Sequence, residues 1–388
     1  MTLTFFSNYF NHHQKALCDE WRHLLGDDFT FVETMPIEAF RAGMGWGSEE
    51  IPSYVLKTHT SEQNHAYAME LGMNSDLVVM GTAPEEFIEA RLLADKLTFR
   101  YSERPLKEGF IKFFIPHLTK KYYHLHIKNR KKNLYILAAS AYTAYDYRKM
   151  RCYINKCYKF GYFPQHLEYD IDKLMSGKPH GEVTKILWAG RMLKLKRPDL
   201  VVEAAARMRD KGYRFTLTMI GEGEEHEHIK RMVRHYRLSD LTSFVDFLSP
   251  MEARNAMAQA NIYLMTSNFW EGWGSVIYEA LNAGCAVIAS HACGATPWLV
   301  KHEETGLVFR SGSVDSLSEN LELLLQSKEL QETYGRAAYE QMHKLWNPQV
   351  AAQNVLQLAK CLESGKDTDI VEGPGSKAGI LGNHWFRG

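Results

Sequence analysis

Short apolar runs alternate along this chain with longer segments in which apolar residues recur every three or four positions. The short runs have the length of buried strands, and the longer segments have the period of amphipathic helices. Strands that alternate with helices form right-handed βαβ units around a parallel sheet. The predicted strands are Leu3–Phe6, Thr30–Val32, Leu77–Met80, Leu97–Tyr101, Leu134–Ala138, Ile186–Ala189, Thr216–Ile220, Ser243–Phe247, Ile262–Met265, Ala286–Ala289 and Gly306–Phe309.

The segments between these strands predict helices of two to four turns. They are His12–Leu25, Ser61–Leu71, Glu85–Ala94, Ala141–Met150, Arg197–Lys211, Glu224–Tyr236, Met251–Gln259 and Ser275–Asn282, and Trp346-Asn347-Pro348 begins a last one.

The polar stretch Asp172–Glu182 contains Gly, Pro and Ser without an apolar period, which is typical of a linker. We therefore expect two doubly wound α/β domains, residues 1–171 and 172–345. A helix over 346–365 is expected to pack back on the first domain, and 366–388 to form a flexible tail. Ligands of open α/β sheets bind at the carboxyl ends of the strands, so the site is expected in the cleft between the domains.

Composition narrows the function classes. The 388 residues carry 46 Lys+Arg and 46 Asp+Glu, so no overall basic field indicates a nucleic-acid partner. The six scattered cysteines form no C-x-x-C pair and are typical of thiols in a reducing compartment. The N-terminus lacks the basic start of a signal peptide, and the longest nearly apolar run, Leu134–Tyr145, is too short to cross a bilayer. These features predict a cytoplasmic protein.

Three loops of the second half follow predicted strands and carry candidate ligand groups. Gly190-Arg191 with Lys196 offers a planar fork and a point charge that suit a diphosphate, although a solvated basic turn has the same composition. Gly221-Glu222-Gly223 lets a ligand approach the backbone, but the third glycine of G-x-G-x-x-G is replaced by His226, and a plain turn is the simpler interpretation. Phe247-Leu248 could face a base or belong to an ordinary strand-to-helix loop.

The fourth loop is the most informative. Glu271-Gly272-Trp273-Gly274-Ser275-Val276 precedes a helix that carries Glu279, so two carboxylates lie eight residues apart around a glycine-rich turn. Backbone amides at a helix N-terminus suit phosphate, and a carboxylate accepts hydrogen bonds from two neighbouring sugar hydroxyls. The pattern predicts a site for two sugar rings around a diphosphate. The competing interpretation, two solvated carboxylates, leaves Trp270 and Trp273 unexplained.

As a set, these motifs resemble the C-terminal half of retaining, GT-B-fold glycosyltransferases of family 4, over roughly 185–310. The resemblance includes the E-x7-E pattern of Glu271 and Glu279, followed by Gly284-Cys285-Ala286-Val287-Ile288-Ala289 and Gly306-Leu307-Val308. It implies that Arg191 and Lys196 hold the donor diphosphate, that Glu279 binds the nucleotide ribose, and that Glu271 and the amides of 272–275 hold the transferred sugar. It also implies a UDP- or GDP-type sugar donor, transfer with retention, and no obligatory metal or other cofactor, in keeping with the absence of a D-x-D motif.

The first half matches this family less closely. Ser7-Asn8 to Gln14 replaces the usual glycine-rich loop, and Thr98 to Pro105 stands where many relatives carry a histidine. With Tyr158–Pro164, these segments look like the subgroup that makes bacterial capsule and exopolysaccharide. The acceptor-side candidates are Asn8, His12, Ser102, Glu103 and Arg104, each of which also has an ordinary structural interpretation, such as a cap or an internal ion pair.

One basic segment stands apart from these loops. Residues 117–135 carry six Lys and Arg and no acidic residue, with Tyr122, Tyr123, Leu125 and Ile127 interleaved. Such a helix can lie on an anionic membrane surface, where a lipid-linked acceptor would be found, or be a solvated face; RNA binding lacks a recognisable module.

The sequence thus predicts a cytoplasmic or peripheral-membrane glycosyltransferase with a glycan or lipid-linked acceptor. The alternatives are a nucleotide-sugar epimerase or hydrolase of the same fold, and a non-catalytic sugar-nucleotide-binding protein.

Overall fold

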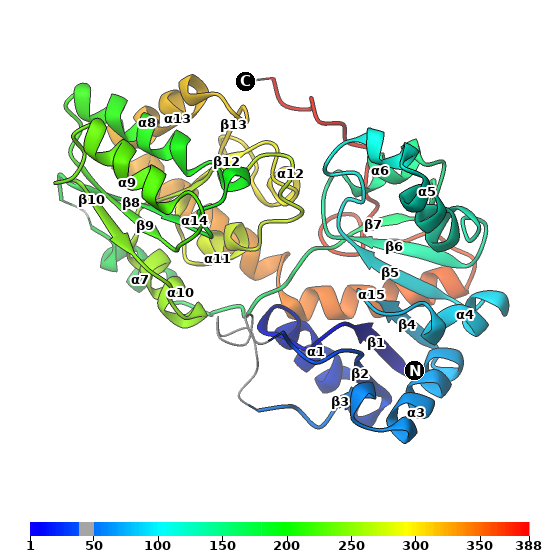
Figure 1. The fold of residues 1–388 in the computed structure, drawn as a ribbon. Helices are drawn as coiled ribbons and strands as arrows, with labels where there is room; N and C mark the ends of the chain where they lie inside the picture. The colour runs from blue at the N-terminus through cyan, green and yellow to red at the C-terminus, as the bar shows by residue number, and fades with distance from the viewer. Residues whose placement is uncertain (39–49, 180, 388) are drawn as a thin grey trace. The chain divides into compact units, whose positions relative to one another are not determined.

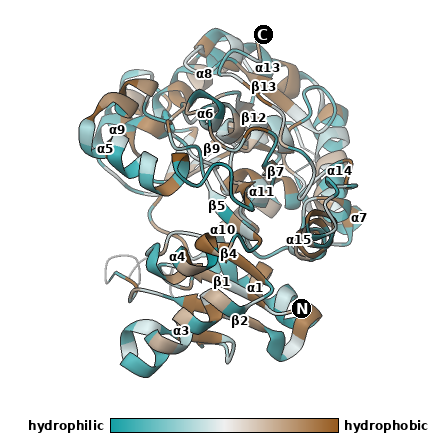
Figure 2. Cartoon of the chain, turned by 90° about the vertical axis from the view of Figure 1, so that its right-hand side faces the viewer, coloured by the Kyte–Doolittle hydropathy of each residue, from teal (hydrophilic) through white to brown (hydrophobic). Residues whose placement is uncertain are grey.

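The computed structural model describes residues 1–38, 50–179 and 181–387, which divide into two compact units. Unit 1 comprises Met1–Gln165 and Leu345–Gly382, and unit 2 comprises His166–Lys344 and the last residues from Asn383 onward. Each unit is a parallel β-sheet with helices packed against it (Figure 1). Hydropathy alternates along the helices, seen as brown and teal bands in Figure 2, as expected for helices with one face against a sheet.

Unit 1 has a seven-stranded parallel sheet in the order β3-β2-β1-β4-β5-β6-β7. Its strands are β1 Leu3–Ser7, β2 Phe29–Glu33, β3 Val55–Lys57, β4 Leu77–Met80, β5 Thr98–Ser102, β6 Leu134–Ala138 and β7 Cys157–Lys159. Its α-helices are α1 His12–Leu25, α3 Glu62–Asn74, α4 Glu86–Leu93, α5 Pro116–Tyr122, α6 Thr143–Lys149 and α15 Pro348–Glu363. Helical turns η1 Gly26–Asp28, η2 Thr58–Thr60, η3 Phe110–Phe114 and η4 Tyr123–Ile127 connect them.

Unit 2 has a six-stranded parallel sheet in the order β10-β9-β8-β11-β12-β13. Its strands are β8 Thr184–Ala189, β9 Phe215–Ile220, β10 Thr242–Val245, β11 Ile262–Met265, β12 Ala286–Ser290 and β13 Gly306–Phe309. Its helices are α7 Ile171–Gly177, η5 Lys194–Lys196, α8 Pro198–Asp210, α9 His226–His235, α10 Pro250–Gln259, α11 Val276–Asn282, α12 Thr296–Leu299, α13 Val314–Gln326 and α14 Lys328–Lys344.

The strand order of unit 2 has a functional consequence. The chain runs outward from β8 to β10 and then returns to the other side of β8 with β11, so β8 and β11 flank the point where the connections change direction. Right-handed connections then place helices on both faces: α8 packs against α9 and α13, and α11 packs against α10 and α14. The carboxyl ends of β8 and β11 are where open α/β sheets bind ligands.

The two doubly wound α/β units agree with the predicted fold class, and every predicted strand is present. The sequence pattern missed β3 and β7, which are three residues long and form the two edges of the unit 1 sheet. A three-residue edge strand has too little apolar alternation to be distinguished from a loop.

The boundaries of the two units differ from those predicted from the sequence. Where a linker is predicted over 172–182, the structure has α7, whose Met175 is buried against Gly284 and Gly335, and the units divide between Gln165 and His166. Helix α15 lies in unit 1, where the Trp21 indole of α1 donates a hydrogen bond to Ala352 O (3.2 Å).

The predicted tail also makes specific contacts. Lys159 of β7 exchanges backbone hydrogen bonds with the tail, accepting from Gly375 N (2.8 Å) and donating to Ser376 O (2.7 Å). The Tyr158 hydroxyl donates to Asp367 Oδ1 (2.8 Å). Residues 375–378 thus pair with the edge of the unit 1 sheet, which a composition rich in Gly and polar residues does not reveal.

Candidate functional site

The loops after β8 and β11 of unit 2 are fixed against each other by hydrogen bonds. The Thr266 hydroxyl donates to Lys196 O (2.7 Å), and Asn268 N donates to Leu195 O (2.8 Å). The buried Trp188 indole of β8 donates to the same Thr266 hydroxyl (3.1 Å). Two loops that are 70 residues apart in the sequence therefore form one surface at the switch point of the sheet.

This surface carries an ion pair that the sequence analysis did not foresee. Lys196 Nζ contacts Glu271 Oε2, and the Ser267 hydroxyl donates to the same carboxylate oxygen (3.1 Å). The Lys196 and Glu271 side chains are 17% and 14% exposed, so both are held near the surface with limited access to water. The two residues predicted to hold the diphosphate and the sugar are thus in direct contact.

Arg191 lies in the same β8 loop and is exposed. Its guanidinium makes no hydrogen bond or ion pair with the residues that the structure describes. An exposed arginine in the same loop as Lys196 offers the five N–H donors of its guanidinium to an anion.

The glycines Gly221 and Gly223 after β9 allow close packing of loops. A Cβ on Gly221 would lie 2.3 Å from Gly190 O, and one on Gly223 would lie 2.5 Å from Met192 O. Both have positive φ angles, +114° and +154°. Met192 N donates to Glu222 O (2.7 Å), which ties the β9 loop to the β8 loop. The backbone of Gly221 and Gly223 therefore packs against the β8 loop that carries Gly190 and Arg191.

The glycine-rich turn after β11 is packed in a similar way. A Cβ on Gly274, at φ +88°, would lie 2.5 Å from the sulfur of Cys293 in the loop after β12. Trp273 is buried, and its carbonyl accepts from the Cys293 thiol (2.8 Å) and from Ala295 N (3.0 Å). Gly272 is buried as well. These contacts fix the backbone on which Glu271 is mounted.

Glu279 lies on α11 and is buried against Arg254 of α10, whose Nη1 is 3.3 Å from Glu279 Oε1. Burial raises the pKa of this carboxyl to about 7, and the neighbouring Arg254 opposes the rise. The carboxyl therefore changes its charge near neutral pH. Sequence reasoning proposed Glu279 but missed Arg254, because a single arginine in an amphipathic helix gives no signal of its partner.

The remaining predicted donor residues lie on neighbouring loops. Phe247 and Leu248 lie between β10 and α10, and the Phe247 side chain is half-exposed, as a residue available to a planar ring would be. Ser249 begins α10 with a capping box completed by Glu252. Ser275 and Val276 begin α11, where the Ser275 side chain makes no capping bond.

The acceptor-side candidates of unit 1 lie after β1 and β5. The Asn8 carbonyl accepts from Thr34 N (3.0 Å) and Met35 N (2.7 Å), and the His12 ring lies 3.9 Å from the His13 ring at the start of α1. Ser102 ends β5 and shares a hydrogen bond with the Tyr147 hydroxyl (3.0 Å), while Glu103 pairs with Lys107 (3.4 Å).

Arg104 has a structural environment. Its guanidinium is buried and holds Asp146 through Nε (3.2 Å) and Nη2 (3.0 Å), and Leu106 N donates to the same carboxylate (2.9 Å). The internal ion pair considered from sequence thus exists, with Asp146 in place of Glu103. This contact favours a role in fixing the loop after β5 over direct contact with an acceptor.

Unit 1 contains a further buried carboxylate that sequence reasoning missed. Glu33 ends β2, accepts from Phe10 N (2.9 Å) and lies 3.0 Å from His59 Nε2. It anchors the loop between β1 and α1 that carries Asn8 and His12.

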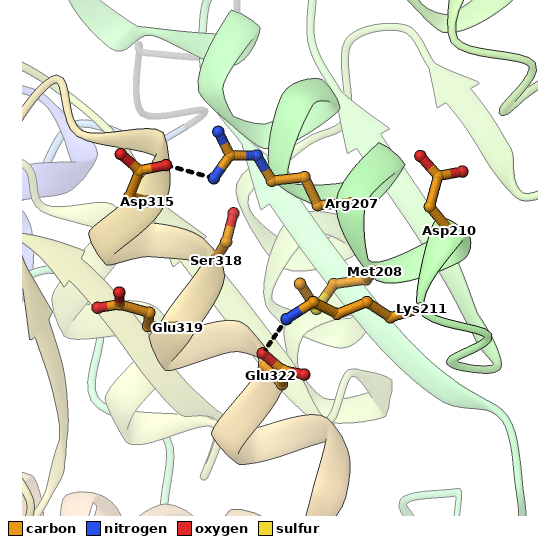
Figure 3. A pocket seen from close by; sticks show the side chains of 8 residues that line it. All are labelled: Arg207, Met208, Asp210, Lys211, Asp315, Ser318, Glu319 and Glu322. Atoms are coloured by element: carbon orange, nitrogen blue, oxygen red, sulfur yellow. Dashed lines mark hydrogen bonds and ion pairs between the residues drawn. The ribbon is translucent and has the colours of Figure 1, made fainter.

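A surface cavity of unit 2 lies away from these loops. Its volume is about 460 Å³, and it lies between α8 and α13. The ion pairs Arg207–Asp315 and Lys211–Glu322 cross it, as Figure 3 shows. Four of its six charged side chains are paired across the two helices, so it resembles an ion-paired groove more than a catalytic site.

No group of three or more His, Cys, Asp or Glu in the described ranges is placed to hold a metal ion. Within the same residues, no helix is both long enough and apolar enough to span a bilayer.

Comparison with known proteins agrees with this geometry. Residues 171–341 match the model of the family "Glycosyl transferases group 1". A GDP-mannose-dependent alpha-(1-6)-phosphatidylinositol monomannoside mannosyltransferase of Mycobacterium tuberculosis is 27% identical over 172 residues, 43% of this chain and 44% of that protein. The amylovoran biosynthesis glycosyltransferase AmsK of Erwinia amylovora is 26% identical over 184 residues, 46% of this chain and 44% of that protein.

The chain spans less than half the length of the curated relatives it matches. The crystal structure of Anabaena HepE in complex with UDP covers 94% of this chain and 100% of its own, with a TM-score of 0.68 and 15% sequence identity. That likeness shows the fold, two Rossmann-like α/β domains of the GT-B type. The residues that match the group 1 glycosyl transferase model, 171–341, include Arg191, Lys196, Glu271 and Glu279.

Proposed function

We propose that this protein is a retaining glycosyltransferase that moves a sugar from a nucleotide-diphospho-sugar to a glycan or lipid-linked saccharide, in the synthesis of a surface polysaccharide. The observation that carries the proposal is the surface formed by Arg191, Lys196 and Glu271 at the switch point of the unit 2 sheet. The UDP complex of HepE and the GDP-mannose dependence of the mycobacterial relative support a donor of UDP or GDP type. The relative from amylovoran biosynthesis supports a polysaccharide product.

In this proposal, the two cations receive the donor diphosphate. Lys196 has three N–H donors, so it can keep its contact with Glu271 and still donate to a phosphate oxygen. Arg191 adds a planar fork that suits two phosphate oxygens. Together they stabilise the negative charge that develops on the leaving diphosphate, which makes them the catalytic cations of the site without an obligatory metal.

The two carboxylates would bind the two sugars. Glu271 is oriented by Lys196 and Ser267 and would accept hydrogen bonds from hydroxyls of the transferred sugar, beside the backbone of 272–275. Glu279 would accept from the ribose hydroxyls, and Phe247 and Leu248 would face the base.

The transfer step balances without a further reactant. The bond between the anomeric carbon and the diphosphate oxygen breaks, and a bond forms from the acceptor hydroxyl to the same carbon on the same face. The hydroxyl proton passes to the departing phosphate oxygen. Arg191 and Lys196 hold that oxygen in place, so the leaving group acts as the base.

The proposed setting is the cytoplasm, with acceptor groups near Asn8, His12, Ser102 and Glu103 of unit 1. The six cysteines are free thiols, and five are buried, which fits a reducing compartment.

The test is calorimetric titration of the full chain with UDP, GDP, ADP and CMP sugars, followed by transfer assays with the donor that binds. We expect one nucleotide class to bind, with Arg191→Ala and Lys196→Ala each weakening it by about 10- to 100-fold, the effect of losing one charge-assisted hydrogen bond. Lys194→Ala is the matched control, because Lys194 is an exposed cation of the same loop.

Three results would contradict the proposal. Equal losses in the Lys194 control would mean that only the general charge of the loop matters. Turnover of the donor without any acceptor would instead support a hydrolase, which releases the sugar, or an epimerase, which changes its configuration. Inversion of the anomeric configuration in the product would exclude the same-face step.

A further inference from the structure

A surface of unit 1 that the proposed donor site does not use carries exposed apolar side chains. It runs from η3 through α5 to η4, residues 110–127 (Figure 1). The Ile111 and Phe114 side chains are 76% and 69% exposed, and Ile115 and Tyr123 are exposed as well. The Phe114 ring packs edge-on against Phe110 (5.4 Å between centroids) and Phe113 (5.9 Å). The exposed ring is therefore part of a continuous aromatic cluster. Large apolar side chains grouped on a surface mark an interaction site.

The inner side of this segment is firmly attached to unit 1. The Tyr122 hydroxyl donates to Pro105 O (3.1 Å), and the Tyr122 ring stacks on Phe113 (6.1 Å between centroids). His126 is buried and lies 3.2 Å from the Tyr153 hydroxyl through Nδ1. Positions 118, 122 and 126 follow the helical period and turn inward, so the positions between them are held outward.

The outward positions are basic. His117, Lys120, Lys121 and His124 are exposed on the opposite side of α5 and η4. Lys128, Arg130 and Lys131 continue the exposed basic run, and no Asp or Glu occurs between residues 109 and 133. The whole chain has equal numbers of acidic and basic residues, so this concentration of positive charge is local.

We infer that this surface docks on an anionic lipid bilayer, with Ile111, Phe114, Ile115 and Tyr123 entering the interfacial region and the flanking lysines facing the headgroups. Apolar side chains beside exposed lysines are the combination that interfacial segments use, because burial and charge attraction add. The sequence analysis placed the contact at 117–135. The structure moves its apolar part upstream to 111–115, because Leu125 and Ile127 are only partly exposed and Leu134 is buried in β6.

A soluble acidic partner or RNA explains fewer of these observations. Charge alone would suit either, but neither accounts for bulky aliphatic side chains such as Ile111 and Ile115 held outward. Single-stranded RNA is bound by aromatic rings interleaved with basic residues, whereas the most exposed large apolar side chain of this segment, Ile111, is aliphatic.

The test is co-sedimentation of the full chain with vesicles of phosphatidylcholine alone and of phosphatidylcholine with 30% phosphatidylglycerol. We expect binding to the anionic vesicles, weakened by high salt, and at least about tenfold weaker binding to the neutral ones. The variant Lys120→Gln/Lys121→Gln should bind about 25-fold less, since each lysine near such a surface contributes about fivefold. Ile111→Ser/Phe114→Ser should bind at least about tenfold less at any salt concentration.

Leu93→Ser is the matched control, because Leu93 is 80% exposed on α4 and lies outside the basic segment. The Leu93→Ser variant should bind vesicles like the unmodified chain. All variants should have the melting temperature of the unmodified chain. The inference is overturned if neutral and anionic vesicles bind equally, if the Ile111/Phe114 variant binds normally, or if the chain binds single-stranded RNA but no vesicle. Vesicle binding needs no sugar donor, so its failure is separate from failure of the proposed transfer activity.

Discussion

Replacing Gly221 by alanine tests whether the β9 loop supports the β8 loop. Gly221 has φ +114°, and its missing side chain leaves room for Gly190 O at 2.3 Å from the position of a Cβ. An ordinary van der Waals contact needs about 3.4 Å, so the alanine would have to move the backbone before Arg191 by about 1 Å. That backbone is tied by the hydrogen bond from Gly190 N to Ile220 O (3.0 Å) and cannot yield freely.

Two contributions lower the free energy of unfolding of this variant. A non-glycine residue at such a φ costs about 1–3 kcal/mol, and displacement of packed backbone costs about 1–3 kcal/mol more. Gly212→Ala separates them, because Gly212 also has a positive φ (+83°) but no atom within 4 Å of its Cβ position. For a unit of this size, 1 kcal/mol changes the melting temperature by about 2–4 °C, so Gly221→Ala should melt about 2–12 °C below Gly212→Ala.

Differential scanning calorimetry measures this difference, and nucleotide titration of the same samples measures its effect on the site. We expect Gly221→Ala to weaken nucleotide binding while Gly212→Ala leaves it unchanged. Equal melting temperatures for the two variants would refute the close-packing argument. A less stable Gly221→Ala with unchanged nucleotide affinity would show that the β8 loop does not transmit the change to Arg191.

Three further predictions follow from buried charges and from the C-terminus. Nucleotide affinity should fall by up to about tenfold per pH unit as the pH drops below about 7, because protonated Glu279 loses its capacity to accept hydrogen bonds from both ribose hydroxyls. Arg254→Gln should move the pH at which the affinity begins to fall upward. Calorimetric titration of both chains with nucleotide from pH 5.5 to 8.5 measures the two effects. Arg104→Met should lower stability by about 3–5 kcal/mol by leaving Asp146 buried without its partner, and a second change, Asp146→Leu, should recover most of that loss in denaturation experiments. Two hydrogen bonds join His291 to the last six residues: its Nε2 lies 3.2 Å from Asn383 O, and the Trp385 indole donates to His291 O (3.2 Å). Removing these six residues should lower the melting temperature of unit 2 in calorimetry. A chain that lacks only the last two residues should melt normally.

The ionisation of Glu279 also predicts the sign of a stability change. Its pKa in the folded chain is raised from 4.5 to about 7, so folding favours the protonated form. The stabilisation from that protonation is fully present below pH 4.5 and is lost as the pH rises through about 7. In the proposed function, nucleotide binding requires the ionised carboxylate. The unliganded chain is therefore less stable at the pH at which the nucleotide binds best.

The strands were predictable because buried parallel strands are continuous apolar runs with clear ends. The predicted and observed bounds of β4, β6, β11 and β13 coincide. The missed strands β3 and β7 are defined by their sheet partners more than by their own sequences. Helix α7 was missed for a similar reason: Met175 is its one buried residue, and no apolar period of its own shows that contact.

The candidate site was predictable where its residues are close in sequence or follow a strand. Arg191, Lys196 and Glu271 all lie in loops after β8 and β11, and parallel topology brings such loops to one edge of the sheet. The partners were not predictable, because Ser267, Arg254 and Asp146 occur in segments of ordinary composition. Their pairing depends on which helix faces or loops meet, and a single sequence does not contain that information.

The structure also changes how the glycines of the β9 loop should be understood. In dinucleotide-binding folds, a G-x-G-x-x-G turn approaches phosphate directly, and the absence of its third glycine here argues against that role. In this chain, Gly221 and Gly223 instead meet the carbonyls of Gly190 and Met192. The Gly221 amide is also already used, because it donates to Val245 O (2.8 Å). Under the proposed function, the side chains of Arg191 and Lys196 would then hold the diphosphate, and the glycines would act by supporting the loop that carries Arg191. Loss of either cation should therefore weaken donor binding directly, by about 10- to 100-fold.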